Sequence, residues 1–477
     1  MMNGAQQGLE VFAMIRRLWI FPLLLCLLFA FFSVASADTI IYQQSGDYDY
    51  LPLEDGTISL IKYYGSDPNL TVPSELDGLP VSEIADGAFS WNNDLVNVRF
   101  SEGIRKIGSQ TFAYSTFLET VTFPDSLLEI GVNPFIGCDA LIGINVSSDH
   151  PILEVRKGVL FNKAEHMLIS YPSSQTASSY TIPDDTESIG TMAFYGNQYL
   201  KSVTIPESVT SLERRSFYLC EKLTEINMPE TFPSLSSEAF FGCSSLKEIS
   251  FPKGVKSLPT GLLRNCKGLT SISLGESIKM IGINCFRGCW NLTSITLPEK
   301  VTSLNAGVFA DCRNLTEVNL SSKLAVIGPS AFNGAESLEH ITLPESLSKI
   351  EKEAFYLCRL LTDLVIPDNV SVIGENAFYG CVSLKTVTIP ASTSLISRGA
   401  FCLCAGMTDL VIPEGVTHIA EQAFMYCQSL QHVSLPASLS VMAPDAFLQC
   451  PQAVFSVPAG SKAEQICANL GLTYETR

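Results

Sequence analysis

The chain has 477 residues, of which 46% are hydrophobic and 16% are charged, and its formal net charge is −18. This hydrophobic content is sufficient to bury a large core and excludes a disordered, charge-rich tail. The sequence contains no cluster of basic residues. Nucleic acid is therefore excluded as an expected partner, because a polyanion would be repelled by the field of the protein.

The first 37 residues have the order of a secretory signal peptide. Arg16 and Arg17 precede an apolar run at 18–32, which small residues follow at 35–37. We expect cleavage after position 37, which leaves a secreted or cell-surface chain without a stable transmembrane anchor. A membrane-anchored form is the alternative, but the run is shorter than the roughly 20 residues that span a bilayer. Met14 is an alternative start of translation.

A phenylalanine recurs at a constant interval, with a 23-residue period, through most of the remaining chain. Leu263 takes its place between Phe240 and Phe286, so the period is unbroken from 194 to 447. The interval from Phe135 to Phe194 is longer than two periods and is not a multiple of the period, so one insertion interrupts the array. Such a period is typical of a repeat protein. The recurring positions are Phe89, Phe112, Phe135, Phe194, Phe217, Phe240, Phe286, Phe309, Phe332, Phe355, Phe378, Phe401, Phe424 and Phe447.

Each repeat has the same internal order, which the unit beginning at Phe309 illustrates. Val318 and Leu320 alternate with polar residues, as in a short strand with one buried face. In most units a proline follows, which cannot donate to a ladder and so ends the strand. We expect the later apolar residues Leu324 and Ile327, with the Ala-Phe of the next unit, to form the opposite wall. One unit cannot bury these faces alone, so stacked units are expected to form a solenoid around one continuous core.

The order Ala377-Phe378, Cys381, Leu384 and then Ile389-Pro390 closely resembles the BspA-like (treponemal-type) leucine-rich repeats of bacterial surface or secreted proteins. The resemblance extends from about residue 48 to the C-terminus. It implies a leucine-rich-repeat right-handed coil, with short parallel strands along one face and mostly irregular or turn backbone opposite. It also links the chain to adhesion and to binding of matrix or host-cell proteins.

The irregular segments resemble this family as well. Residues 53–57 and 77–81 are similar to its opening cap, 158–163 and 168–172 to its recurrent hairpin, and 457–461 with 463–470 to its closing helix. The expected organisation is a signal peptide (1–37), an N-terminal β cap (38–80), first repeats (81–146), a β-hairpin insertion (147–182), a main run of 23-residue repeats (183–456) and a C-terminal helical cap (457–477).

Eleven of the 15 cysteines lie three residues after the repeat Phe or its Leu263 substitute. A secreted chain with many cysteines favours disulfides, and neighbouring coils would satisfy the distance for bridging. The alternative is a ladder of buried free thiols, each acting as a small hydrophobe with a weak donor. Ala335, Asn197 and Ser115 occupy the same slot, which favours the free thiols.

No catalytic or cofactor-binding motif stands out in the sequence. It contains no glycine-rich phosphate loop, no H-E-x-x-H, no G-x-S-x-G and no calcium loop. Zinc at Cys402 with Cys404, or at Cys285 with Cys289, lacks a second ligand pair at the required spacing. We therefore predict no enzyme activity, no catalytic residue, no metal and no cofactor.

The exposed side of the predicted strands is the expected binding face. It is polar and acidic and has no aromatic stripe, which weakens a carbohydrate-binding interpretation. The alternative is that short polar residues only decorate a solvated sheet. The candidate residues, at eight or ten positions after the repeat Phe, are Asn227, Glu225, Glu248, Glu317, Asn319, His340, Thr342, Asp363, Thr388, Asp409 and His432.

Three classes of function follow from these observations. A secreted or surface protein that binds an extracellular or host protein fits the length of the repeated face and the lack of catalytic motifs. A passive structural spacer predicts that substitutions such as Glu317 with Asp363 change no binding. An enzyme would need a domain outside the repeats, and the departures at 38–80 and 147–182 are too short to be one.

Overall fold

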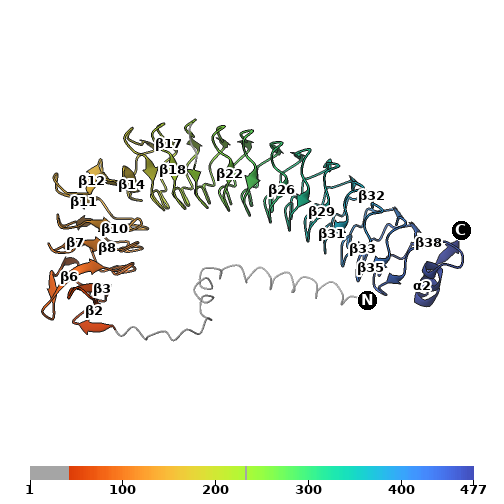
Figure 1. The fold of residues 1–477 in the computed structure, drawn as a ribbon, viewed down its shortest axis with the longest axis horizontal. Helices are drawn as coiled ribbons and strands as arrows, with labels where there is room; N and C mark the ends of the chain where they lie inside the picture. Colours follow the sequence, from red (N-terminus) through yellow and green to blue (C-terminus); the bar gives the residue numbers. More distant parts are fainter. Residues whose placement is uncertain (1–41, 231–233) are drawn as a thin grey trace, which may run out of the picture. The chain divides into compact units, whose positions relative to one another are not determined.

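The computed structural model describes residues 42–230 and 234–477, and the predicted signal peptide lies outside these residues. Short strands follow one another coil by coil from Gln44 to Arg477, which form one compact unit (Figure 1). The predicted repeat solenoid is confirmed. None of the helices in the described ranges is long and apolar enough to cross a lipid bilayer.

The first ladder of parallel strands lies where the sequence predicted it. In β27, Val318 is buried while Glu317 and Asn319 are exposed, and the strand pairs in register with the equivalent strand of the preceding repeat. The strands on this side are β4 (Asn69–Val72), β7 (Asn97–Phe100), β9 (Thr120–Thr122), β11 (Gly143–Asn145), β15 (Ser179–Thr181), β17 (Ser202–Thr204), β19 (Glu225–Ile226), β21 (Glu248–Ser250), β23 (Ser271–Ser273), β25 (Ser294–Thr296), β27 (Glu317–Asn319), β30 (Asp363–Val365), β32 (Thr386–Thr388), β34 (Asp409–Val411) and β36 (His432–Ser434).

The opposite wall is more regular than the sequence predicted, because a second parallel ladder of mostly two-residue strands runs along it. Strands this short cannot display a period of two, so their sequence does not distinguish them from turns. The strands are β8 (Lys106–Ile107), β10 (Glu129–Ile130), β16 (Ser188–Ile189), β18 (Ser211–Leu212), β20 (Ser234–Leu235), β22 (Ser257–Leu258), β24 (Met280–Ile281), β26 (Ser303–Leu304), β28 (Val326–Ile327), β29 (Lys349–Ile350), β31 (Val372–Ile373), β33 (Leu395–Ile396), β35 (His418–Ile419) and β37 (Val441–Met442).

The turn that carries the repeat Phe stacks by its own backbone hydrogen bonds. The N–H of Phe378 donates to the carbonyl oxygen of Ala400 in the next coil at 2.8 Å. The positions two residues before and after this Phe are left-handed, with φ of 54° at Asn376 and 73° at Gly380. Gly and Asn are favoured in that conformation. The Ala-Phe segment is therefore a tight turn, as expected.

The N-terminal segment folds as strands that cover the first coil. It contains β1 (Gln43–Ser45), β2 (Tyr48–Pro52), β3 (Ile58–Tyr63), β5 (Glu75–Leu76) and β6 (Leu79–Ile84). Strands β2 and β3 are antiparallel, and β3 pairs in parallel with β6.

The C-terminal segment consists of β38 (Val454–Val457), helix α2 (Lys462–Leu470) and β39 (Tyr474–Thr476). Helix α2 begins after Ser461, whose side chain accepts a hydrogen bond from the N–H of Glu464, and ends at Gly471 in the left-handed conformation. Each end of the helix thus has a capping residue, Ser461 or Gly471, of a type that is common at that position.

The insertion is a three-stranded meander, not a hairpin alone. Strands β12 (Leu153–Arg156), β13 (Val159–Asn162) and β14 (Met167–Ser170) are antiparallel, and β14 continues in parallel to β16. Its side chains alternate between two cores, because successive residues of a strand point to opposite faces. Val159 and Phe161 belong to the core of the main run, whereas Leu160 and Ile169 belong to the core of the first repeats. The strands of the insertion are therefore largely internal.

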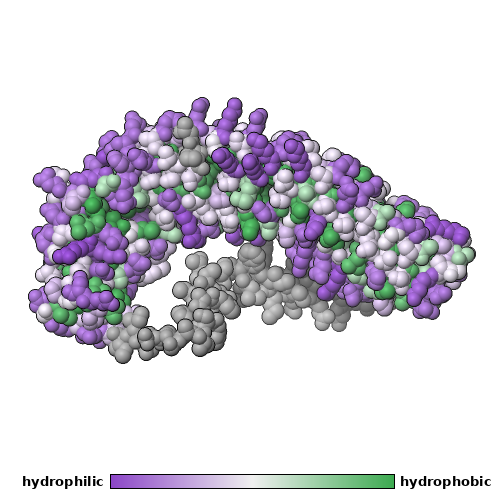
Figure 2. All heavy atoms as spheres, in the orientation of Figure 1, coloured by the Kyte–Doolittle hydropathy of each residue, from purple (hydrophilic) through white to green (hydrophobic). Residues whose placement is uncertain are grey.

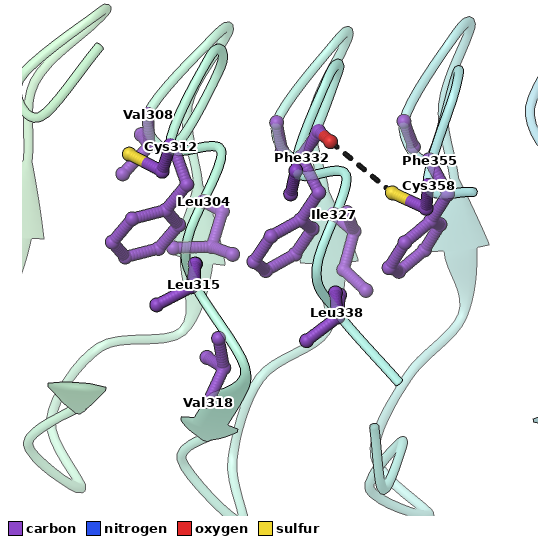
Figure 3. Packing of buried hydrophobic residues seen from close by; sticks show 14 of the residues in the cluster. Leu304, Val308, Cys312, Leu315, Val318, Ile327, Phe332, Leu338, Phe355 and Cys358 are labelled. Atoms are coloured by element: carbon purple, nitrogen blue, oxygen red, sulfur yellow. Dashed lines mark hydrogen bonds between the residues drawn. The ribbon is translucent and has the colours of Figure 1, made fainter. Parts of the chain in front are cut away.

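The repeat phenylalanines stack from coil to coil inside the solenoid. The ring centroids of Phe332 and Phe355 lie 5.1 Å apart with the planes tilted by 11°, and both side chains are fully buried. Figure 3 shows these rings with Leu315, Ile327 and Leu338 of the same core. Offset stacking at this distance adds to the stabilisation from burial.

The cysteine slot has a hydrogen-bonding role. The thiol of Cys358 donates to the carbonyl oxygen of Phe332 in the preceding coil at 3.3 Å (Figure 3), and that of Cys312 donates to Phe286 at 3.2 Å. Ser115 makes the same bond through its hydroxyl at 2.8 Å. Cys and Ser share the slot because both are small donors. The 14 described cysteines carry free thiols.

We expect Cys450 to be the first of these thiols to be alkylated in the folded protein. Burial raises the pKa of Cys312 to about 12, which keeps it protonated. Cys450 is half-buried, and its interaction with the neighbouring Cys427 side chain lowers its pKa. Because the thiolate is the nucleophile, native iodoacetamide labelling followed by peptide mass spectrometry should find Cys450 modified about tenfold faster than Cys312. Equal rates would contradict the burial of the ladder; in urea the two should react alike.

Candidate functional site

The candidate site is the exposed side of the first ladder, which we call the strand ribbon: the residues eight and ten positions after each repeat Phe. All eleven residues predicted for the binding face are exposed. They are distributed along many coils. Residues of adjacent coils therefore lie close together, but the eleven residues do not form one common site. The residues are Glu225, Asn227, Glu248, Glu317, Asn319, His340, Thr342, Asp363, Thr388, Asp409 and His432.

Hydrogen bonds orient several polar side chains of the ribbon. The amide of Asn319 donates to Glu317 at 3.0 Å and to the hydroxyl of Thr296 on the neighbouring strand at 3.2 Å. The carboxylate of Asp363 accepts from Thr386 at 2.8 Å. These contacts join strands at the surface and present the remaining acceptor positions of the carboxylates to solvent.

Asn227 has a structural role that its place in the sequence does not reveal. Its side-chain oxygen accepts from the N–H of Ile205 at 2.7 Å, and its amide nitrogen donates to the Ile205 carbonyl at 2.8 Å. Beyond the end of β19, the Asn227 side chain thus makes the hydrogen bonds to the Ile205 backbone that a paired strand would make. Both polar atoms of this amide are bonded within the protein, although the side chain is exposed.

The ribbon is hollowed where this ladder is interrupted. Strands β19 and β21 belong to separate sheets. A hollow of about 470 Å³ lies there, lined by Ser202, Val203, Thr204, Glu225, Ile226, Asn227 and Glu248. No cationic side chain lines it. Within the described ranges, neither Glu225 nor Glu248 forms a side-chain ion pair.

A second hollow, of about 640 Å³, lies at the next interruption, between β23 and β25. Its lining includes the carboxylates of Glu276, Glu299 and Glu317 together with Asn319. Both hollows are therefore acidic, and five of the predicted residues line one or the other. The spacing of the repeat alone could not locate them, because it is the same in coils that keep their ladder hydrogen bonds.

The C-terminal half of the ribbon differs in character. Residues 340–342 form no strand, and His340 lies 3.3 Å from the hydroxyl of Thr362. Farther along, Val365 is 70% exposed and Val411 is 64% exposed. On the face seen in Figure 2, small hydrophobic patches lie between larger hydrophilic areas. Scattered apolar residues of this kind are ordinary for a protein surface.

Acidic residues in the turns after the first ladder are engaged between coils. The carboxylate of Glu299 accepts from the Ser322 hydroxyl at 2.6 Å and from its N–H at 3.2 Å. The carboxylate of Glu414 accepts from the N–H groups of Ala437 at 2.8 Å and Ser438 at 3.1 Å. These hydrogen bonds lower the pKa of Glu299 and of Glu414. Part of the negative charge thus stabilises the stacking of coils.

Acid should weaken this stacking. Because the bonded form is the carboxylate, the stabilisation is complete above the unfolded pKa of about 4.3. It declines below that pH and is lost once the pH falls through the lower folded pKa. Urea midpoints measured at pH 7 and pH 3 should therefore differ less for Glu299→Gln with Glu414→Gln than for the wild type. An identical pH dependence of the two proteins would refute this role.

A row of aromatic rings on the turn side was not predicted from the sequence. The rings of Tyr195 and Tyr218 stack at 5.5 Å, those of Tyr218 and Phe241 stack at 4.6 Å, and the Arg264 guanidinium lies 5.6 Å from the Phe241 ring. Tyr195, Tyr218 and Phe241 each lie one residue after a repeat Phe, and this shared position could have predicted the row. Because the ring faces cover one another, the row contributes to stacking of the coils.

The described residues contain no group of three or more His, Cys, Asp or Glu side chains arranged to hold a metal ion. Of the two cysteine pairs considered for zinc, Cys289 donates its thiol to the Leu263 carbonyl and Cys404 donates to that of Phe378. The geometry therefore assigns these two thiols to the stacking of coils.

Comparison with known proteins assigns the repeats. The family model described as BspA type Leucine rich repeat region (6 copies) matches residues 82–174, 170–289, 256–371 and 348–469. No curated protein matches the chain.

Two of the solved structures that are similar to this chain are bacterial leucine-rich repeat proteins. A leucine-rich repeat protein from Bacteroides ovatus is 23% identical, with 91% of this chain and 99% of that one covered and a TM-score of 0.53. A leucine rich cell surface protein from Faecalibacterium prausnitzii is 22% identical, with 90% and 98% covered and a TM-score of 0.42. The first likeness shows the fold. Since the family model covers most of the sequence, the chain belongs to the BspA-type leucine-rich repeat family.

Proposed function

We propose that this protein is a secreted or cell-surface adhesion scaffold that binds an extracellular or host protein through its strand ribbon. The observation that carries the proposal is the acidic hollow between β19 and β21, where Glu225 and Glu248 are exposed without a cationic neighbour in the lining. Carboxylates that only stabilised the fold would accept hydrogen bonds from neighbouring coils, as those of Glu299 and Glu414 do. Complementary charge is the usual means by which such a surface selects a partner.

The ribbon supports the binding of a protein better than that of a small molecule. The hollows are open and shallow, and exposed polar residues continue from β17 to β36. Specific protein interfaces bury about 800 Å² on each partner, which many adjacent strands can supply together. We expect a basic patch on the partner opposite the ribbon.

The test compares two charge reversals. Immobilised wild-type protein is used to capture extracellular proteins, in parallel with Glu225→Lys with Glu248→Lys and with a control, Glu187→Lys with Glu421→Lys. The control residues are exposed and lie outside the ribbon. Both variants change the net charge equally. A partner retained by the wild type and the control but lost by the ribbon variant supports the proposal.

A passive spacer is the second candidate function, favoured by the many polar ribbon contacts that are internal, such as Asn319 with Glu317. It predicts that wild type, ribbon variant and control retain the same proteins. That result, or capture of no partner by any of them, would overturn the binding function. Secretion is tested separately by N-terminal sequencing of exported protein, which should begin at Asp38.

A further inference from the structure

A cleft of about 320 Å³ lies beside the insertion, away from the strand ribbon. Its walls come from the second ladder and its turns on one side, and from the meander and the first coil of the main run on the other. The lining includes Ile130, Val132, Asn133, Glu165, Met167 and Glu213. No residue of the strand ribbon lines this cleft.

The cleft exists because the insertion breaks the second ladder. The sheet that contains β8 ends at β10, and the sheet that contains β14 begins at β12, so no ladder hydrogen bonds join β10 to β14. The two sides are instead held by side chains. Asn133 is buried and its amide donates to the Met192 carbonyl at 2.7 Å, while the hydroxyls of Tyr114 and Tyr195 are 3.0 Å apart. The walls are therefore fixed before any ligand binds.

The lining combines an apolar surface with unpaired negative charge. Ile130, Val132 and Met167 provide aliphatic and thioether contacts. The only charged residues of the lining are Glu165 and Glu213. Among the side chains described by the structure, none forms an ion pair with either carboxylate. Such a lining suits a ligand with an apolar stem and a positively charged head.

The volume limits the size of that ligand. Small-molecule sites usually have about 300 to 1,000 Å³, so this cleft is at the lower end and accommodates one long side chain. We propose that the cleft binds the cationic side chain, lysine or arginine, of a partner polypeptide. The proposal does not depend on the ribbon, because the two surfaces share no residue. Under this proposal the insertion takes part in recognition through the residues that line the cleft, although most of its strand residues are buried.

The test follows the methyl resonance of Met167, which lies in the lining, in protein labelled with ¹³C at the methionine methyl groups. Met167→Leu assigns the signal. The probe is acetyl-Ala-Arg-Ala-amide, and the matched control probe replaces arginine by citrulline, which has nearly the same shape but no charge. We expect the arginine peptide to shift the Met167 signal and to bind at least about tenfold more tightly than the citrulline peptide, as for one charge-assisted contact.

Two variants then locate the binding. Glu165→Gln with Glu213→Gln should weaken binding of the arginine peptide about tenfold, whereas Glu225→Gln with Glu248→Gln, in the ribbon, should leave it unchanged. Urea unfolding checks that both variants are folded. Equal affinity for the two peptides, an unshifted Met167 signal, or weakening only by the ribbon variant would overturn the proposal. None of these results would affect the capture experiment on the ribbon.

Discussion

Replacing Phe309 by Ala is expected to lower the free energy of unfolding by about 3 to 5 kcal/mol. The side chain is fully buried, and its ring stacks on Phe286 at 5.5 Å and on Phe332 at 5.4 Å. Removal of the ring leaves a cavity between coils that the backbone hydrogen bonds of the turn, such as that from Phe309 to Ala331 at 2.8 Å, prevent from closing. Chemical denaturation followed by circular dichroism measures the change.

Two controls separate stacking from a general effect of losing an aromatic residue. Phe309→Leu should cost much less, about 1 kcal/mol, because Leu263 occupies the same slot and is fully buried there. Phe117→Ala should cost still less, since Phe117 is 61% exposed. A loss near zero for Phe309→Ala would contradict a core made of stacked coils.

Leu160→Ala and Phe161→Ala should both be strongly destabilising, although these residues are neighbours on one strand. Leu160 is fully buried in the core of the first repeats, and Phe161 is 3% exposed in the core of the main run. We expect losses of about 2 to 5 kcal/mol for Leu160→Ala and about 3 to 5 kcal/mol for Phe161→Ala. A hairpin lying on the surface would instead tolerate one of the two substitutions.

Hydrogen exchange should show which core each substitution loosens. Leu160→Ala is expected to reduce protection of β9, and Phe161→Ala that of β16 and β18, because each side chain packs on one side of the meander only. Lys163→Ala, in the turn between β13 and β14, serves as the control and should change neither region. The same pattern of exchange for both core variants would refute the two-core arrangement.

The exposure of the candidate site residues was predictable from the sequence, and their side-chain contacts were not. Alternation of apolar and polar residues in units such as Glu317, Val318 and Asn319 predicted which side chains are buried and which are exposed. The sequence could not reveal that the amide of Asn227 is bonded to Ile205, or that Glu299 is engaged by Ser322 while Glu225 is not. Those differences depend on which side chains of adjacent coils face one another.

By itself, the sequence determined the solenoid, its first ladder, its cysteine slot and its interruption. Because the repeat length is constant, the Phe, Cys and Pro of each unit have the same surroundings as those of the other units. The structure of one unit therefore predicts that of the others. Only the tertiary structure decided where the ladders break and which face of the insertion meets which core. Breaks arise from contacts between particular coils, and the burial of Leu160 and Phe161 on opposite sides requires two neighbouring cores that no local pattern specifies. The hollows of the ribbon and the cleft beside the meander therefore belong to the tertiary structure alone.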